Sequence, residues 1–352
     1  MKIAVDISPL ETKHSVWHKV RGSGFYIENL KKSLIKYDSS NRYTFFVRNR
    51  NLPKDIDLIH YPYFEPFFFT LPLLKKHKTV VTVHDLTPLV FSQHFPSGIK
   101  GKLKWQIQKL LLRRTDAIIT DSKSSQKDIE KFAGVSPERI HIVYLAAAEE
   151  FKKVESAKQE AESLRDKYKL PEKFVLYVGD ATWNKNLPRL VEAIKKINLT
   201  LVMVGKAVSE DNFDRQNPWN KDLVKVVELI EDDRRFLRLG FVPIQDLVLL
   251  YNLASVFAMP SLYEGFGLPI LEAMACGCPV VTSKEGSIAE IAGSAAFYAD
   301  AYSVNDIANA IGEVFFSKKM QEDLGKKGMT QSKNFSWKKT AGDTVKIYKS
   351  LL

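Results

Sequence analysis

Two glutamates eight residues apart are the first feature of this sequence that could do chemistry. Glu264 lies on a glycine-punctuated loop, and Glu272 lies inside the helix predicted to follow it. The first backbone amides of a helix have no partner within it, so they can bind an anion or a hydroxyl. Because carboxylates accept hydrogen bonds from sugar and ribose hydroxyls, both glutamates can face one ligand held over the helix start. Alternatively, the glycines are ordinary turn residues and Glu272 is a solvent-exposed charge on a helix.

Lys185 and His84 each follow a predicted strand. Lys185 lies between a strand at 174–179 and a helix at 187–197, where its point charge could neutralise a diphosphate. His84 follows the β-branched run 79–83, and open α/β sheets bind ligands at the carboxyl ends of their strands. By residue type alone, a solvated lysine and a structural histidine would be the commoner outcomes.

Glycines and histidines mark the segment after the first predicted strand. Gly22 and Gly24 lie in a predicted loop just before the first helix. His14 and His18 precede them, without an acidic residue or a cysteine at the spacing of metal ligands. We therefore interpret 11–20 as a mobile lid and not as a metal site.

The elements that carry these residues alternate between strands and helices. Strands are predicted at 2–7, 43–47, 58–61, 79–83, 117–120 and 140–144, and again at 174–179, 199–204, 236–239, 256–259, 279–282 and 296–298. Helices are predicted at 25–37, 102–113, 124–132, 187–197, 222–230, 244–253, 269–275, 288–292 and 303–317. Such alternation predicts parallel sheets covered on both faces. Because the pattern restarts after a charged stretch at 149–169, we predict an α/β protein with Rossmann-like domains at 1–164 and 165–337 and a final helix at 338–352.

Composition bounds the function classes. The chain has 352 residues, and Cys276 and Cys278 are its only cysteines, which excludes a disulfide framework and gives no zinc cluster. The longest uncharged run, 247–263, contains polar residues and a proline, and it is shorter than the roughly 20 apolar residues of a membrane-spanning helix. We therefore expect a soluble protein of the cytoplasm.

The formal net charge of +11 lies mostly in the first half of the chain. Residues 1–150 hold 24 Lys+Arg against 15 Asp+Glu, a net of +9, and 93–115 has six basic residues and no acidic one. A basic amphipathic helix can lie on an anionic membrane, so 100–114 could make a peripheral contact at the inner membrane surface. Alternatively, its apolar side is core and its lysines are solvated. No zinc finger, helix-turn-helix or aromatic RNA-binding strand is recognisable, so nucleic acid is not an expected partner.

The stretch from Pro260 to Gly277 resembles a known signature. Its run Glu264-Gly265-Phe266-Gly267-Leu268-Pro269 and the later Glu272 match the E-x7-E pattern of the retaining glycosyltransferases of family 4. The resemblance covers essentially the whole chain, through Asp6, His84-Asp85, Tyr177-Val178-Gly179, Gly240-Phe241-Val242 and Phe335-Ser336-Trp337. It implies the GT-B fold, in which two Rossmann-like domains with parallel sheets face each other across a cleft, and a final helix that returns to the first domain.

The resemblance also implies roles for individual residues. Glu264 and His84 would be the catalytic groups at the donor sugar, and Glu272 would bind the ribose. The remaining donor contacts would come from Lys185 on the diphosphate, from the loop amides of Gly265, Phe266, Gly267 and Leu268, and from Gly179, Val242, Gly22 and Gly24. A glycine is needed where a side chain would block the approach of backbone amides to a phosphate. No metal is expected, since cationic side chains and helix dipoles would balance the charge of the leaving diphosphate.

The predicted activity is transfer of a hexose, with retention, from a nucleotide-sugar to an acceptor hydroxyl of a glycan or glycolipid. The opening Asp-Ile-Ser-Pro-Leu and the Val-His-Asp-Leu-Thr-Pro run look most like mannosyltransferases of polysaccharide assembly. GDP-mannose is therefore the expected donor and a UDP-sugar the alternative. Asp180 stands where the family often carries an arginine, which motivates a second hypothesis, a non-catalytic sugar-nucleotide or polysaccharide-binding protein on the same scaffold. A membrane-surface scaffold is a third.

Overall fold

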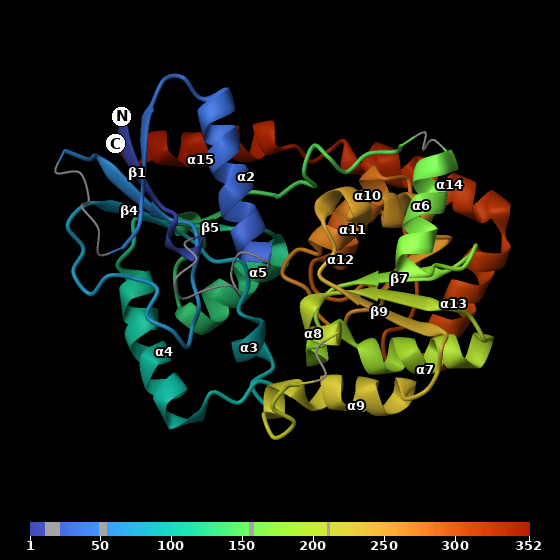
Figure 1. Ribbon diagram of the computed structural model, residues 1–352. Coiled ribbons are helices and arrows are strands. Elements are labelled where there is room, and N and C mark those ends of the chain that lie inside the picture. Colours follow the sequence, from blue (N-terminus) through green and yellow to red (C-terminus); the bar gives the residue numbers. More distant parts are fainter. Residues whose placement is uncertain (11–21, 49–54, 155–157, 210–211) are drawn as a thin grey trace. The chain divides into compact units, whose positions relative to one another are not determined.

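The computed structural model describes residues 1–10, 22–48, 55–154, 158–209 and 212–352 (Figure 1). The chain divides into two compact units, one made of Met1–Ala146 with Phe335–Leu352 and the other of Ala147–Asn334. The sequence predicts these boundaries at 164/165 and 337/338. The charged stretch before residue 165 belongs to the second unit, because Lys167 and Tyr168 at the end of helix α6 both bond to Asp246 there.

The first unit is built on a six-stranded parallel sheet with the order β2-β1-β3-β4-β5-β6. Its strands are β1 (Lys2–Asp6), β2 (Arg42–Phe46), β3 (Leu58–Tyr61), β4 (Lys78–Thr82), β5 (Ala117–Thr120) and β6 (Ile140–Ile142). Its helices are α2 (Gly22–Tyr37), α3 (Thr87–Val90), α4 (Gly98–Arg113), α5 (Lys123–Asp128), which continues as a π-helical turn at Ile129–Ala133, and α15 (Trp337–Ser350). Every residue of β5 is buried, as expected where both faces of a parallel sheet are covered.

The second unit repeats this plan with a parallel sheet of order β12-β11-β10-β7-β8-β9. Its strands are β7 (Val175–Val178), β8 (Leu201–Val204), β9 (Phe236–Gly240), β10 (Val256–Met259), β11 (Val280–Thr282) and β12 (Phe297–Tyr298). Its helices are α6 (Lys158–Tyr168), α7 (Leu187–Ile197), α8 (Lys206–Ser209), α9 (Lys221–Ile230), α10 (Ile244–Leu253), α11 (Leu268–Ala275), α12 (Ile288–Ala292), α13 (Val304–Phe316) and α14 (Lys318–Ser332). The observed sheets confirm the predicted α/β class.

Each unit has a hydrophobic core of its own. In the first, Val81 and Ile118 from neighbouring strands are completely buried. In the second, α7 buries Leu190, Val191 and Ile194, which lie on one side of the helix because residues three and four apart share a face. The apolar residues that recur with helix and strand spacing in the sequence are therefore buried in two separate cores.

The helix α15 completes the first unit. Trp337 at its start packs against Phe25 and Tyr26 of α2, with ring centroids 6.3 and 6.2 Å apart. Near its end, the Tyr348 hydroxyl lies 2.6 Å from Nδ1 of His60 on the central strand β3. A segment far along the chain thus supplies a polar partner to the buried interior of the first sheet.

Two of the helices that differ from the sequence prediction contain glycines. The helix α2 begins at Gly22, so Gly22 and Gly24 lie in its first turn and not in a loop. The helix α14 is not predicted at all, because it is polar and contains two glycines, Gly325 and Gly328, which weaken both the apolar period and the helix propensity. Both glycines are buried, so packing stabilises a helix that its own sequence favours little.

The longest described helices, α2 and α4, have 16 residues each. No helix in the described ranges is both long enough and apolar enough to cross a bilayer.

Candidate active site

In the second unit, Lys185 and Glu264 form a largely buried ion pair. The Lys185 Nζ lies 2.9 Å from Oε1 and 2.8 Å from Oε2 of Glu264. The Glu264 side chain is 8% exposed and that of Lys185 20%. The family resemblance implies that the two residues contact different parts of one donor, whereas in the structure they bond to each other. The pair offers a phosphate a charged hydrogen-bond donor and offers a hydroxyl an acceptor.

Asn184 joins the two loops that carry this pair. Its side-chain Nδ2 donates to the main-chain carbonyl of Tyr263 at 3.0 Å. Its main-chain carbonyl accepts a hydrogen bond from the Leu262 amide at 2.7 Å. Asn184 directly precedes Lys185 in the sequence, and its two partners, Leu262 and Tyr263, directly precede Glu264. The separation of the ammonium and the carboxylate is therefore set by main-chain bonds and not only by mutual attraction.

Asn186, at the start of α7, anchors the loop from the other side. Its φ of 58° is left-handed, a conformation that asparagine tolerates better than most residues. Its Nδ2 donates to the carbonyls of Pro260 and Ala301, at 2.9 and 2.7 Å, and the side chain is 1% exposed. Lys185 thus lies between two asparagines that both bond to the loop after β10, and Asn186 also bonds to Ala301.

The backbone of Glu264 is held by the turn that precedes α12. The amide and the hydroxyl of Ser287 donate to the Glu264 carbonyl at 3.1 and 2.9 Å. A Cβ at Gly286 would lie 2.7 Å from that carbonyl oxygen, and its φ is 63°, so only glycine allows this approach without displacement. The Glu264 carboxylate therefore projects from a backbone fixed on both sides.

The glycine-rich loop ends at Gly267, whose φ of 91° requires glycine. Helix α11 begins at the next residue, Leu268, with Pro269 in its first turn, where a missing amide proton costs no intrahelical bond. Gly265 and Phe266 are buried and Leu268 is half-buried. The loop-to-helix junction expected from the sequence is present, and the contacts of its amides with a sugar stay a prediction.

Glu272 lies inside α11 with 7% of its surface exposed. Its Oε2 accepts a hydrogen bond from the Tyr251 hydroxyl at 3.0 Å. Burial raises the pKa of Glu272 to about 7, although the hydrogen bond from Tyr251 opposes the shift. A ligand that donates hydrogen bonds to this carboxylate would favour its ionised form, which is what a pair of ribose hydroxyls would do.

Two glycines of α14 allow that helix to pack closely on α11. A Cβ at Gly325 would lie 2.6 Å from the Gly277 carbonyl oxygen just after α11, and one at Gly328 would lie 3.1 Å from Cγ of Met274. Since Met274 and Glu272 belong to the same short helix, α14 helps to set the position of the Glu272 carboxylate.

Gly179 and Val242 follow β7 and β9, the two strands of the second sheet that flank β8. The Gly179 amide donates to the carbonyl of Val204, and the Gly205 amide donates to that of Gly240, at 2.9 and 3.0 Å. A Cβ at Gly205 would collide with the Gly179 carbonyl oxygen. Val242 is 6% exposed. Both predicted donor residues therefore lie at the carboxyl ends of parallel strands, the edge at which open α/β sheets bind ligands.

Asp180, where an arginine is common in the family, directly follows this strand end. Its carbonyl accepts a hydrogen bond from the Tyr177 hydroxyl. Burial raises the pKa of Tyr177 well above its usual value, and the negative charges of Glu264 and Asp180 add to that effect. The Asp180 side chain therefore contributes negative potential close to the Lys185–Glu264 pair.

In the first unit, His84 pairs with Asp121. The Nδ1 of His84 lies 2.7 Å from Oδ2 of Asp121. His84 comes two residues after β4 and Asp121 directly after β5, and these strands are neighbours in the sheet. The Asp121 side chain is 3% exposed and that of His84 18%. The pair therefore lies at the carboxyl edge of the first sheet.

The Asp121 carboxylate controls the protonation of His84. Burial alone would lower the pKa of His84, but the neighbouring carboxylate outweighs it, and the pKa lies above its usual value. The proton is therefore kept on Nδ1. Within the described part of the chain, Nε2 of His84 and Oδ1 of Asp121 are buried and have no hydrogen-bond partner. Buried polar atoms are nearly always paired, so Nε2 is a position suited to a ligand.

A chain of polar groups supports His84 inside the first unit. The Tyr26 ring packs edge-on against the His84 ring, with centroids 4.7 Å apart. The Tyr26 hydroxyl lies 3.1 Å from Oγ1 of Thr82, which lies 2.8 Å from Nε2 of His60. Burial, aided by the nearby His84, lowers the pKa of His60 to about 3, so His60 stays neutral at physiological pH. Tyr348 closes the chain at Nδ1 of His60.

Gly22 and Gly24 are not in the loop that the sequence predicts. They lie in the first turn of α2, with Gly24 buried and Gly22 exposed. A Cβ at Gly22 would meet no described atom within 4 Å, so packing around it does not demand a glycine. Helix formation extends over these glycines because Phe25 and Tyr26 of the same turn pack against Trp337. The predicted lid at 11–20 lies outside the described residues.

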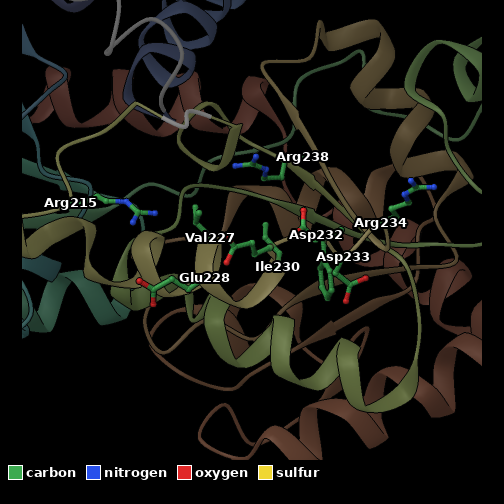
Figure 2. A pocket seen from close by; sticks show the side chains of 10 residues that line it. Arg215, Val227, Glu228, Ile230, Asp232, Asp233, Arg234 and Arg238 are labelled. Atoms are coloured by element: carbon green, nitrogen blue, oxygen red, sulfur yellow. The ribbon is translucent and has the colours of Figure 1, made fainter.

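A cavity of about 510 Å³ lies elsewhere in the second unit, between α9 and β9 (Figure 2). Side chains of both charges line it, and Figure 2 shows Arg215 and Arg234 at opposite ends of the view, with Asp232 and Asp233 near Arg234. Asp233 is itself paired with Arg235. The lining includes none of the described residues assigned from the sequence, and its mixed charge does not favour a diphosphate. The Lys185–Glu264 pair is therefore the better candidate site.

Three supporting residues are missing from the sequence prediction. Asp121 could have been found, because it directly follows a predicted strand, as His84 does. Tyr251 pairs with Glu272 across 21 positions, and Ser287 with Glu264 across 23, and no local pattern links them. Partners of this kind are determined by tertiary packing.

Comparison with known proteins gives matches over both units. The family model described as "Glycosyl transferases group 1" matches residues 136–331, and the model described as "Glycosyltransferase Family 4" matches residues 12–148. The serotype-specific mannosyltransferase WbdA of Escherichia coli is 29% identical over 282 residues, which cover 78% of this chain and 34% of that protein. The chain thus spans about a third of the length of WbdA. The O-antigen chain mannosyltransferase B of Escherichia coli is 30% identical over 300 residues, covering 84% of this chain and 76% of that protein.

Solved structures match in fold over the whole chain. Sucrose-phosphate synthase from Thermosynechococcus elongatus gives a TM-score of 0.77 at 19% identity, covering 100% of this chain and 99% of that one. The Anabaena protein HepE, in complex with UDP and glucose, gives a TM-score of 0.74 at 18% identity, covering 99% and 100%. These likenesses confirm the predicted GT-B fold class. Because one family model spans more than half of the chain and a 30% identical relative is covered over most of its length, the chain belongs to the group 1, family 4 glycosyltransferases.

Proposed function

We propose that this chain is a retaining mannosyltransferase that moves mannose from GDP-mannose to a hydroxyl of a glycan or glycolipid in polysaccharide assembly. The observation that carries the proposal is the buried Lys185–Glu264 pair beside α11, the helix that contains Glu272. The choice of mannose is supported by two relatives named as mannosyltransferases, one of which acts on an O-antigen chain by its name.

In the second unit, binding of the donor would break the Lys185–Glu264 ion pair, and each residue would then contact the donor. Lys185 would move its Nζ from Glu264 to the diphosphate and offset the charge that grows as the bond from the sugar to phosphate breaks. Glu264 would then accept hydrogen bonds from the sugar hydroxyls, and Glu272 from the ribose. The first amides of α11 would add donors to the same ligand.

In the first unit, His84 would present Nε2 to the donor sugar, because Asp121 holds the proton on Nδ1. The acceptor oxygen would form its bond to C1 on the face from which the diphosphate leaves. The acceptor proton would pass to the departing phosphate oxygen, so that charge and atoms balance without a protein nucleophile. The anomeric configuration would be retained.

A UDP-sugar is the alternative donor. It is favoured by the fold likeness to HepE, whose solved complexes contain UDP, glucose and UDP-glucose. Calorimetric titration with GDP, UDP and ADP separates the two, and we expect GDP to bind most tightly. Tighter binding of UDP would overturn the choice of GDP-mannose and leave a glycosyltransferase of another donor.

The activity itself is tested by incubation with a panel of nucleotide-sugars and measurement of nucleotide release, with NMR of the product for the anomeric configuration. Release from GDP-mannose with an α product from an α donor is expected. Nucleotide binding without release from any donor, with glycan and glycolipid acceptors present, would support the non-catalytic alternative that Asp180 motivates.

The site is tested by Lys185→Gln, which we expect to weaken GDP binding about tenfold or more, because a charge-assisted contact to the diphosphate is lost. The matched control is Lys225→Gln. Lys225 forms an ion pair with Glu192 in the same unit, with side chains 53% and 32% exposed, and its loss should leave GDP binding unchanged. Equal effects of the two substitutions would contradict the site.

A further inference from the structure

Exposed apolar side chains gather in one part of the first unit. Of the thirteen large hydrophobic side chains that are exposed in the described ranges, seven lie between residues 68 and 110. Soluble proteins expose such residues singly, and a concentration of them marks an interaction surface. The seven belong to helix α4 (Figure 1) and to the loop between β3 and β4.

Helix α4 exposes a narrow apolar stripe. Ile99 is 88% exposed, Leu103 63% and Leu110 54%. At about 100° per residue, the three lie within about 40° of one another on the helix. Gln108 is completely buried on the opposite side, where its Nε2 donates to Oγ1 of Thr70 in the loop before β4, at 2.6 Å. The sequence left open whether the apolar side of this helix is core, and the structure shows a core side, with Leu112 at 0% exposure, and a separate exposed stripe.

The loop before β4 adds four exposed apolar side chains next to this helix. Phe68 and Phe69 are 60% and 54% exposed, and their rings lie 5.5 and 6.0 Å from Nζ of Lys104 on α4. Leu73 and Leu74 are 68% and 75% exposed. Leu73 lines a small hollow together with residues at the end of α4. We call the α4 stripe the docking face. The four loop residues lie on a segment that bonds to the opposite side of the helix through Gln108, and they add exposed apolar surface to the same part of the first unit.

The surroundings of the docking face are basic. Lys100 and Lys102 lie on α4 and Lys76 lies on the loop, and all three are exposed. No acidic residue occurs in 93–115. The first unit as a whole holds 28 Lys+Arg against 14 Asp+Glu, a net of +14, whereas the second holds 24 against 27, a net of −3. The apolar surface therefore lies in the unit with the strong positive charge.

We infer that the docking face binds the surface of an anionic lipid bilayer. The exposed aliphatic stripe, with Lys100 and Lys102 on either side of it along α4, matches a layer that is apolar inside and negatively charged outside. A nucleic acid would use the charge but would leave Ile99, Leu103 and Leu110 in water. An acidic protein partner would not require a stripe this apolar. The inference does not depend on the proposed donor chemistry.

The test is sedimentation of the full chain with vesicles of phosphatidylcholine alone and of phosphatidylcholine mixed with phosphatidylglycerol. We expect binding to the mixed vesicles, weaker binding to the neutral ones, and loss of binding as salt is added. Equal binding to both vesicles, or no binding to either, would overturn the inference. Because no nucleotide is present, either result leaves the test of the proposed function standing.

Two sets of variants separate the apolar and the charged contributions. Ile99→Ser with Leu103→Ser and Leu110→Ser should weaken vesicle binding about tenfold or more. Lys76→Gln with Lys100→Gln and Lys102→Gln should weaken it on the order of 100-fold at low salt, since each basic residue near such a surface is worth about fivefold. All six residues are exposed, so the fold should tolerate the changes.

The matched controls lie in the second unit. Phe316→Ser removes a side chain that is 71% exposed, and Lys326→Gln with Lys327→Gln removes two exposed charges. These variants should bind vesicles like the parent chain, and all variants should keep its affinity for GDP or UDP. Equal losses in the control variants would overturn the inference. So would self-association in solution that the stripe variants abolish, because a second copy of the chain would then cover the docking face.

Discussion

The His84–Asp121 pair determines which histidine nitrogen carries a proton. The carboxylate accepts from Nδ1 at 2.7 Å, and Nε2 is the nitrogen that stays open to a ligand among the described groups. Asp121 is nearly fully buried and acts through His84, so it is a positioning residue. Its contribution should appear in the titration of His84 before it appears in substrate binding.

We expect Asp121→Asn to lower the pKa of His84, because burial is then opposed only by the weaker effects of Asp85 and Glu65. Activity, as kcat/KM, should fall about 100-fold, and binding of GDP should be unchanged. NMR titration of labelled histidine, with His84→Gln for assignment, measures the pKa. Asp343→Asn, which removes an exposed pair with Lys346, is the control. An unaltered His84 titration would contradict the role given to Asp121.

Glu272 makes the second unit less stable as the pH rises. Its pKa is about 7 in the folded chain and 4.5 without the fold, so between these values the folded state holds a proton that the unfolded state has lost. The contribution of Glu272 to the free energy of unfolding should therefore be highest below pH 4.5. It should fall by about 3 kcal/mol as the pH rises to about 7. Above that value the cost is constant.

Glu272→Gln should remove this pH-dependent loss, because an amide cannot ionise and still accepts from Tyr251. Urea unfolding measures the free energy of unfolding at pH 5 and at pH 8, and the difference between these two values should be about 2.5 kcal/mol smaller in the variant. Affinity for the nucleotide should fall as stability at pH 8 rises. Glu313→Gln, at an exposed position of α13, should change neither quantity. A gap equal to that of the parent chain would show that Glu272 is ionised in the folded protein.

The sequence indicates residues whose side chains would contact the ligand themselves. It does not indicate residues that only position such a side chain. Glu264 and Lys185 are predicted to meet one ligand, and they lie within 3 Å of each other. The bond between them is not predicted, because nothing in the sequence shows that two loops 79 residues apart close on each other. Tyr251 is missed for the same reason.

At the scale of elements, contact between α11 and α14 shows how a helix of weak intrinsic propensity is used. Gly325 and Gly328 remove the side chains that would hold the two helices apart. The short helix α11 carries Glu272 and opens directly after the glycine-rich loop. The distance between the two helices thus affects the candidate site directly.

Gly325→Ala should therefore destabilise the second unit by about 2 kcal/mol, because the new Cβ meets the rigid Gly277 carbonyl at 2.6 Å. Gly312→Ala is the matched control, since this helical glycine in α13 has no atom within 4 Å of an added Cβ. It should stabilise the unit by about 0.5–1 kcal/mol. Chemical unfolding measures both, and a stabilising effect at Gly325 would contradict the close packing.

The elements that the sequence predicts well are those with a continuous apolar signal. The buried strand β5 is predicted with its observed bounds, as is the amphipathic helix α7. The helix α14 escapes prediction because its stability comes from tertiary contacts, and the start of α2 is misplaced because glycines usually indicate a loop. Local patterns thus determine most of the fold, and glycine-rich packing determines the rest.

At the scale of the whole molecule, the two units have separate cores and opposite net charges. The catalytic histidine proposed here lies in the positively charged unit, and the proposed nucleotide contacts lie in the other. Ligands and substitutions that act on one core should therefore be distinguishable from those that act on the second.

We expect calorimetry to resolve two unfolding transitions. A bound nucleotide should raise the transition of the second unit alone. Tyr348→Phe should lower only the other transition, by about 3 °C or more, because Nδ1 of buried His60 loses its partner. Tyr302→Phe, at a residue that is 56% exposed in the second unit, should shift neither. A single transition that responds to both changes would show that the units unfold together.

The return of α15 to the first unit has a consequence for synthesis on the ribosome. His60 and its strand emerge early, but their partner Tyr348 follows only after the whole of Ala147–Asn334 has been made. At about 5–20 residues per second, that interval lasts on the order of 10–40 s. The second unit is continuous in sequence and has all its residues before the first one does. The half of the protein that begins the chain is therefore the last to complete its fold.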